Sequence, residues 1–93
     1  MTLRSYNSSA SDHDVQESMR RAADFGMIPG VEWAISGANL GVVPLNEGLT
    51  HASLLAVPDA AVLKNFYNHP QHEEAAGLSR SITDRLLVMD IQA

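Results

Sequence analysis

The sequence predicts one α+β domain with the ferredoxin-like order of strand, helix, strand, strand, helix and strand. The chain has 93 residues, the length of a single domain, and 45% of them are hydrophobic, which is enough for a packed core. Segments with strand-like alternation and segments with helical spacing follow one another in this order. Residues typical of turns separate them, so we expect one domain over residues 1–93.

The first strand is predicted over residues 2–6, where the sequence TLRSY alternates weakly. A helix is predicted to follow Ser11, the expected N-cap, because apolar residues recur at helical spacing as far as Ala23. Gly26 and the Pro29–Gly30 pair are expected to end this helix. Strands are then predicted over residues 31–37 and 49–57, which alternate in the manner of half-buried strands.

Asp59 is the expected N-cap of a short second helix, whose apolar stripe runs from Val62 to Tyr67 at spacings of three and four. Pro70 is expected to break this helix and to begin another, since the first turn does not need its missing N–H group. The last strand is predicted over residues 84–92, with Asp90 inside it. Helices on one face would leave the other face of the sheet to be covered, and dimerisation is the simplest way to cover it.

Charge and composition exclude several classes of function. The net charge is −5 and the basic residues are scattered, so a nucleic acid is not expected as a partner. The N-terminal segment lacks the apolar core of a signal peptide, and no apolar run approaches the ~18 residues of a membrane span. We therefore expect a soluble, cytoplasmic protein without membrane association. The absence of cysteine excludes disulfides, thiolate zinc sites and a cysteine nucleophile.

The sequence YNHPQH, residues 67–72, holds two of the four histidines. His72 would lie in the first turn of the new helix, either as a general base or in a local hydrogen bond. His69 would stand at the edge of that helix, as an N-cap or a backbone contact. A metal held by His69, His72 and Glu73 is a third possibility, but His69 lies outside the helix and zinc usually takes three or four protein ligands. We expect no metal.

Several segments resemble the stress-responsive A/B barrel (Dabb) family. The marks of the resemblance are EGLTHASLLAV, then FYNHPQH, then LLVMDI, with IPGVEW upstream. The resemblance implies a ferredoxin-like protomer and a homodimer whose two sheets form an α+β barrel. The family includes plant stress proteins and polyketide cyclases of the olivetolic acid cyclase type, and the latter imply a cofactor-independent enzyme.

In those cyclases the second histidine of the His-Pro-x-His motif is the general base, and this role carries over to His72. A nearby tyrosine assists it, and that position falls at Phe66, with Tyr67 one residue further on. One residue turns a helical side chain by about 100°, so Tyr67 is a candidate donor only if it still reaches the same cavity. Family members usually begin with a longer first strand that carries a histidine. Here either the strand is short or the protein starts further upstream.

The remaining candidates are His51, Asp90 and two aromatic residues. His51 could donate to a developing enolate, or it could point into the dimer interface. Asp90 could orient a histidine and fix its tautomer, contact the substrate in the pocket, or be a paired structural acid. Trp33 and Phe66 are candidate contacts for a hydrophobic substrate. The expected function is a small cyclase that promotes intramolecular aldol-type condensation of a poly-β-keto substrate, and the alternative is a non-catalytic or ligand-binding stress protein.

Overall fold

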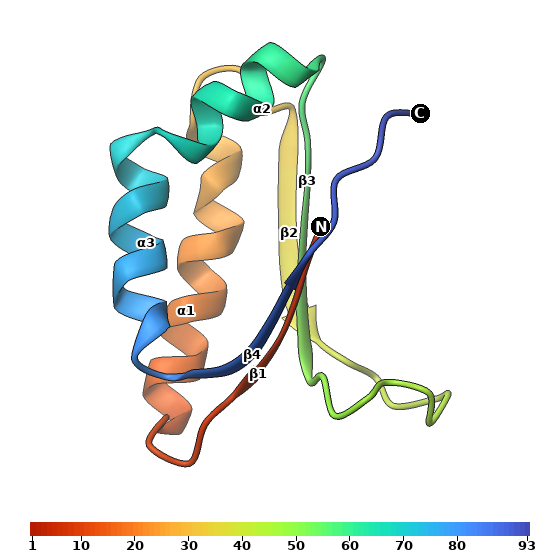
Figure 1. The fold of residues 1–93 in the computed structure, drawn as a ribbon. Helices are drawn as coiled ribbons and strands as arrows, with labels where there is room; N and C mark the ends of the chain where they lie inside the picture. Colours follow the sequence, from red (N-terminus) through yellow and green to blue (C-terminus); the bar gives the residue numbers. More distant parts are fainter.

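The computed structural model describes all residues, 1–93, and has one sheet with helices packed against one of its faces (Figure 1). The strands are β1 (Thr2–Tyr6), β2 (Trp33–Ala38), β3 (His51–Ala56) and β4 (Thr83–Val88). The helical elements are α1 (Asp12–Asp24), the 3-10 helix η1 (Phe25–Met27), α2 (Ala60–Tyr67) and α3 (Pro70–Arg80). This confirms the predicted order of elements and the division of the second helical region in two. None of the helices has the length and hydrophobicity of a membrane-spanning segment.

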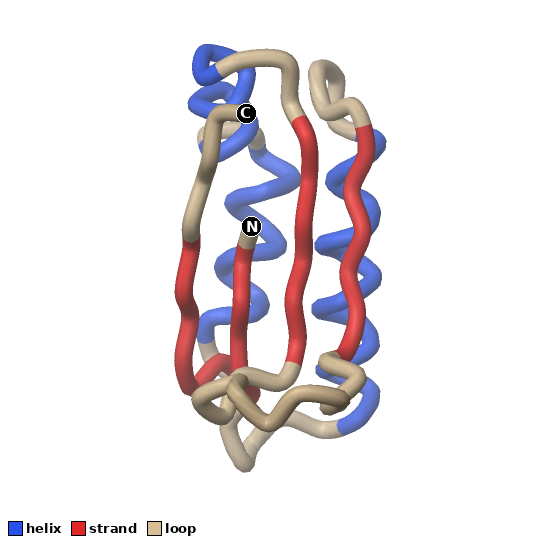
Figure 2. Tube along the Cα trace, turned by 90° about the vertical axis from the view of Figure 1, so that its right-hand side faces the viewer, coloured by secondary structure: helices blue, strands red, loops and turns tan.

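The four strands are antiparallel neighbours in the order β2-β3-β1-β4, so that β1 lies inside the sheet (Figure 2). Arg4 of β1 is opposite His51 of β3 on one side and Leu86 of β4 on the other. Directly opposed residues place their side chains on the same face of a sheet. Arg4, His51 and Leu86 therefore form one row on the face that the helices cover.

The predicted helix N-caps are confirmed. Ser11 and Asp14 form a capping box, in which each side chain accepts a hydrogen bond of 3.1 Å from the backbone N–H group of the other. Asp59 Oδ1 accepts from the N–H group of Val62 at 2.9 Å. His69 Nδ1 accepts from the N–H group of Gln71 at 3.1 Å, so this histidine holds the start of α3. Because Pro70 is the first residue of α3, His72 lies within its first turn.

Several strand boundaries differ from the sequence-based expectation, including that of β3, which was expected over residues 49–57 and is formed by His51–Ala56. Asp90 was expected inside the last strand, and this is wrong because β4 ends at Val88. The neighbouring strand β1 begins at Thr2, which is opposite Val88, so only Met1 remains to pair beyond that point. At the start of β2, the N–H group of Val31 bonds to the carbonyl of Ile28 in a turn, and the strand begins later, at Trp33.

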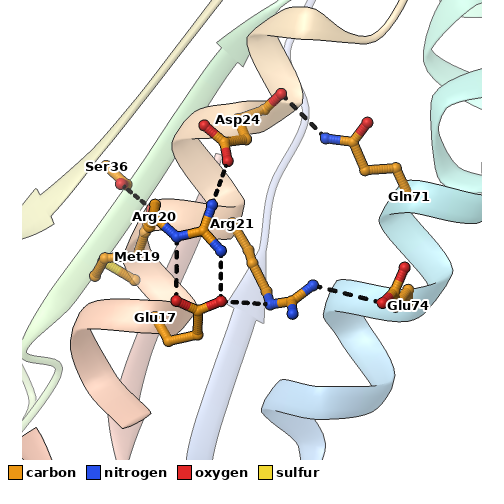
Figure 3. Close-up of polar contacts among 8 residues, drawn as sticks. All are labelled: Glu17, Met19, Arg20, Arg21, Asp24, Ser36, Gln71 and Glu74. Carbon is orange, nitrogen blue, oxygen red and sulfur yellow. Dashed lines mark hydrogen bonds and ion pairs between the residues drawn. The ribbon is translucent and has the colours of Figure 1, made fainter. Parts of the chain in front are cut away.

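Polar contacts tie α1 to the sheet and to α3 (Figure 3). Ser36 Oγ of β2 donates to the carbonyl oxygen of Met19 at 2.6 Å. On the other side of α1, Gln71 Nε2 of α3 donates to the carbonyl oxygen of Asp24 at 3.1 Å. Arg21 adds an ion pair of 3.7 Å to Glu74 of α3. These contacts hold the two long helices in place over one face of the sheet.

The hydrophobic core is small, and the second face of the sheet is open. Ile28, Val31 and Phe66 form the buried cluster, with further apolar residues of η1, β3 and α2 packed around it. Only 8 of the 93 residues are buried, because one sheet face has no layer over it. Trp33 and Ile35 point to that open face, since they alternate with Ser36, and they are 48% and 57% exposed.

Candidate active site

A cavity of about 240 Å³ lies between the sheet and helices α1 and α3. Of its 20 lining residues, 11 are hydrophobic, so the wall is mainly apolar. Tyr67, His72 and Asp90 stand together at the end where α2 stops and α3 begins. Arg4 lines the wall further along β1. An apolar wall with a few polar groups is typical of a site for a small hydrophobic molecule.

His72 is held in one orientation by aromatic packing and by one hydrogen bond. Its ring centroid lies 4.8 Å from that of Phe66, 5.6 Å from that of Phe25 and 5.3 Å from that of Tyr67. Its Nδ1 lies 3.1 Å from the backbone carbonyl oxygen of Tyr67. A carbonyl oxygen only accepts, so Nδ1 must carry a proton, and neutral His72 then has its lone pair on Nε2. The hydrogen bond thus assigns the tautomer that a general base at Nε2 requires.

Tyr67 is bound to Asp90. The phenol donates to the carboxylate, with distances of 2.9 Å to Oδ2 and 3.1 Å to Oδ1. Burial, and then the hydrogen bond to Asp90 and its negative charge, raise the pKa of Tyr67 to about 12. The hydroxyl of Tyr67 therefore keeps its proton at neutral pH and is available as a hydrogen-bond donor beside His72.

Phe66 and Tyr67 take different places in the wall. Phe66 is 4% exposed and packs edge-on against Phe25 at a centroid distance of 5.1 Å, so it belongs to both the core and the cavity wall. Tyr67 is half-buried and its ring stands at 81° to the ring of His72. Its hydroxyl is directed to Asp90, beyond the end of β4. The tyrosine one position later in the sequence thus still lies beside His72.

Two of the candidate residues lie outside the cavity. His51 does not line it, and its Nδ1 is instead 2.8 Å from Oγ1 of Thr50, with its ring edge-on to Tyr6 at 5.1 Å. Burial, and then the positive charge of Arg4, lower the pKa of His51. Trp33 lies on the open face of the sheet, because the alternation of β2 turns it away from the helices.

His69 and the acidic residues near it do not form a metal site. The Nδ1 atom of His69 is used at the N-cap of α3, and its neighbour His72 is bonded to a backbone carbonyl. No three histidine, aspartate or glutamate side chains converge in a way that could hold a metal ion.

Arg4 is a cavity residue that the sequence patterns did not single out. The alternation of TLRSY places Thr2, Arg4 and Tyr6 on one face of β1, and Tyr6 identifies that face because its hydroxyl donates to Ser18 of α1 at 2.8 Å. A charged residue at the middle of that inward-facing row was the available signal. To use this signal, one would have to know which face of this weakly patterned strand the helices cover.

The fold and the cavity together define a class of small α+β domain with a mainly apolar site between sheet and helices. The chain belongs to the family described as the stress responsive A/B barrel domain (Dabb), whose model matches residues 1–93. This confirms the resemblance seen in the three sequence segments. No curated protein matches the chain significantly.

Solved structures with the same fold share little sequence with the chain. The Arabidopsis thaliana protein At3g17210 is 22% identical, with a TM-score of 0.88 over 99% of this chain and 90% of its own. A hydroxynitrile lyase from Passiflora edulis is 21% identical, with a TM-score of 0.82 over 95% of this chain and 84% of its own. A protein from Thermobifida fusca described as dimeric and ferredoxin-like is 17% identical, with a TM-score of 0.79 over 92% and 80%. At these identities the likeness shows the fold alone.

Proposed function

We propose that the chain is a small cofactor-independent enzyme of the cyclase type, with His72 as its general base. The observation that carries the proposal is the hydrogen bond from His72 Nδ1 to the carbonyl of Tyr67, because it leaves Nε2 unprotonated in a ring that lines the cavity. The reaction would be an intramolecular aldol-type condensation of a poly-β-keto substrate. No cofactor is needed, since a base and a hydrogen-bond donor supply the required proton transfers.

The proposed reaction begins when Nε2 of His72 removes a proton from a carbon between two carbonyl groups, which gives an enolate and an imidazolium. The enolate carbon attacks a second carbonyl carbon of the same molecule, so that one C–C bond forms and the electron pair of that carbonyl moves to its oxygen. The imidazolium returns its proton to this oxygen. This leaves His72 in its starting protonation state and the ring closed. Water is then lost from the aldol product as its hydroxyl group leaves with a hydrogen of the carbon next to the carbonyl, which forms a C=C bond in the ring.

Tyr67 is proposed to stabilise the enolate oxygen. Its phenol is protonated at neutral pH and stands next to the ring of His72. To donate to a substrate the O–H bond must turn from Asp90 to the enolate, and Asp90 keeps the phenol ring in place before that step. Phe66, in the wall beside His72, would contact the apolar part of the substrate. We do not assign a role at this cavity to His51 or Trp33, which lie outside it.

The chain is also proposed to act as a homodimer that covers the open face of the sheet. Large apolar side chains are exposed there, and two of the structural neighbours are described as dimeric. Burial of such side chains is the main favourable contribution to association. The cavity lies on the other side of the sheet, so dimerisation would leave it open to ligands.

The test of the proposed chemistry is the rate of ring closure of a synthetic poly-β-ketone, measured for the wild type, His72→Ala and Tyr67→Phe. The rate enhancement is the enzymatic rate divided by the uncatalysed rate. We expect His72→Ala to lower this enhancement by about a hundredfold or more, the usual contribution of a positioned general base. Tyr67→Phe should lower the rate enhancement by a smaller factor than His72→Ala. His13→Ala is the matched control, since His13 is exposed on α1. Wild-type turnover in His72→Ala would refute the assignment.

A second function is supported by two observations. The hydroxyl of Tyr67 is engaged by Asp90, and the cavity wall is mainly apolar, which also suits a protein that binds a hydrophobic ligand without changing it. In that case the wild type and His72→Ala would both bind the poly-β-ketone, and neither would convert it. Product analysis by mass spectrometry separates the two functions.

A further inference from the structure

The cavity contains a charged group that the proposed acid–base chemistry does not use. Arg4 lines the cavity from the middle of β1, and its Nε atom is buried without a hydrogen-bond partner. The guanidinium forms no ion pair, whereas Arg20 and Arg21 on α1 are both paired with acids. The chain has 11 acidic residues against 6 basic ones, so a shortage of acids does not explain why Arg4 has none.

Arg4 as a whole is half-buried, and its buried Nε atom is costly to leave without a partner. A buried polar group without a partner loses its hydration and gains nothing in return, and the cost is larger for a charged group. A second copy of the chain on the open face would not supply the missing anion, because Arg4 points to the helices, in the same row as His51 and Leu86. A partner for Arg4 must therefore enter the cavity itself.

The surroundings of Arg4 suit an anion. Arg80 at the end of α3 lines the same cavity and also has no ion pair. Ser18 and Ser79 add two hydroxyls whose oxygens lie 3.1 Å apart. The only acid in the cavity wall is Asp90, which is at the far end and already accepts from Tyr67. The lowered pKa of His51, to which the charge of Arg4 contributes after burial, agrees with a guanidinium that no acid neutralises.

The two polar ends of the cavity are separated along the sheet. Leu86 is opposite Arg4, and Asp90 follows it by four residues, which at about 3.3 Å per residue of strand places the two levels on the order of 10 Å apart. The wall between them is apolar, with Phe66, Val88 and Ala75 among its residues. A ligand that satisfies both ends would have an anion at one end, an apolar middle and a carbonyl group at the other.

We propose that Arg4 binds the carboxylate of the ligand, so that the substrate class is a keto acid of medium length in the free acid form. Its carboxylate would lie at Arg4 and its reactive carbonyl beside His72. The position of the carbonyl rests on the proposed function, whereas the carboxylate site depends only on Arg4 and its surroundings. Arg4 would thus select free acids over their esters, amides and thioesters.

The test compares octanoate with its neutral counterpart octanamide in titration calorimetry, because both have the same chain and differ in charge. For the wild type we expect octanoate to bind at least tenfold more tightly, the usual effect of a charge-assisted hydrogen bond. In Arg4→Met the ratio of the two dissociation constants should fall to near one. Lys64→Gln, which removes a positive charge from the exposed face of α2, should keep the wild-type ratio. Arg4→Lys should keep part of it.

Equal binding of octanoate and octanamide by the wild type, or no binding of either, would overturn the proposal. So would a wild-type preference for octanoate that survives in Arg4→Met, or tighter binding of inorganic phosphate than of octanoate. Because Arg4 has no protein partner, Arg4→Met should melt no lower than the wild type, and a large fall in melting temperature would make Arg4 a structural residue instead. These measurements need no turnover, so the carboxylate site can hold even if the cyclase proposal fails.

Discussion

The hydrogen bond between Tyr67 and Asp90 makes a quantitative prediction about the pKa of the phenol. The chain has two tyrosines, so in a Tyr6→Phe background Tyr67 is the only phenol and its ionisation can be followed by absorbance near 295 nm. The midpoint should be at about pH 12. Asp90→Asn removes the negative charge and weakens the hydrogen bond but leaves the burial, which is the largest cause, so the midpoint should fall part of the way to the ordinary value of 10.0.

The same pair links stability to alkaline pH. Because the pKa of Tyr67 is raised on folding, its contribution to stability is complete below pH 10 and is lost as the pH rises toward and through 12. Asp90 is 36% exposed, so solvent screens the pair and we expect a contribution of only about 1 kcal/mol. Urea unfolding at pH 8 should therefore show Asp90→Asn about 1 kcal/mol less stable than its parent, and the difference should shrink above pH 10. A midpoint near pH 10 for Tyr67 in the parent protein, or no change in Asp90→Asn, would refute the reasoning.

Three further predictions concern the fold and the open face. Phe66→Ala should reduce the free energy of unfolding by about 3 kcal/mol in urea titrations, since Phe66 is 4% exposed and its loss leaves a cavity in a small core. Gly30→Ala should cost at least about 1 kcal/mol, because Gly30 has φ of +94° and a Cβ atom there would lie 2.8 Å from Cγ1 of Val62. Gly77→Ala, at an exposed site of α3 with no atom of another segment within 4 Å of the added Cβ, should be tolerated, and equal losses in the two variants would contradict the argument. Ile35→Glu should convert a dimer to a monomer in light scattering, and an unchanged mass would place the interface elsewhere.

The sequence predicted the fold where local signals and packing agree. Ser11, Asp59 and Pro70 mark helix starts through chemistry that acts within a few residues, and the structure places the helix starts there. The end of the last strand was wrong because pairing depends on the length of a neighbour that is far away in the sequence. The apolar residues after Val88 look like strand, but the β1 ladder ends where Thr2 lies opposite Val88, and only Met89 beyond it bonds to the β1 side, through Met1.

The site was predictable only in part, for a similar reason. His72 could be placed in the first turn of α3 because Pro70, two residues earlier, sets the start of that helix. The face on which a strand residue lies is set by the sheet register, and the alternation of the predicted strands did not say which face the helices would cover. Trp33 was therefore chosen by residue type and lies on the open face, whereas Arg4 lies in the cavity and was not chosen. His51 does face the helices, but it lies beyond the cavity, beside Thr50 and Tyr6. The contact between Tyr67 and Asp90 joins segments 23 residues apart and follows from the fold alone.

The most direct test of the account is whether His72 removes a proton from carbon next to a ketone. The assay is exchange of the hydrogens beside the ketone of 7-oxooctanoate for deuterium in D₂O, followed by NMR, with wild type, His72→Ala and the exposed control His13→Ala. This probe carries a carboxylate for Arg4 and a ketone for His72. The account predicts exchange faster than in buffer for the wild type and for His13→Ala, and exchange at the buffer rate for His72→Ala. Equal rates in the wild type and His72→Ala would contradict the central claim.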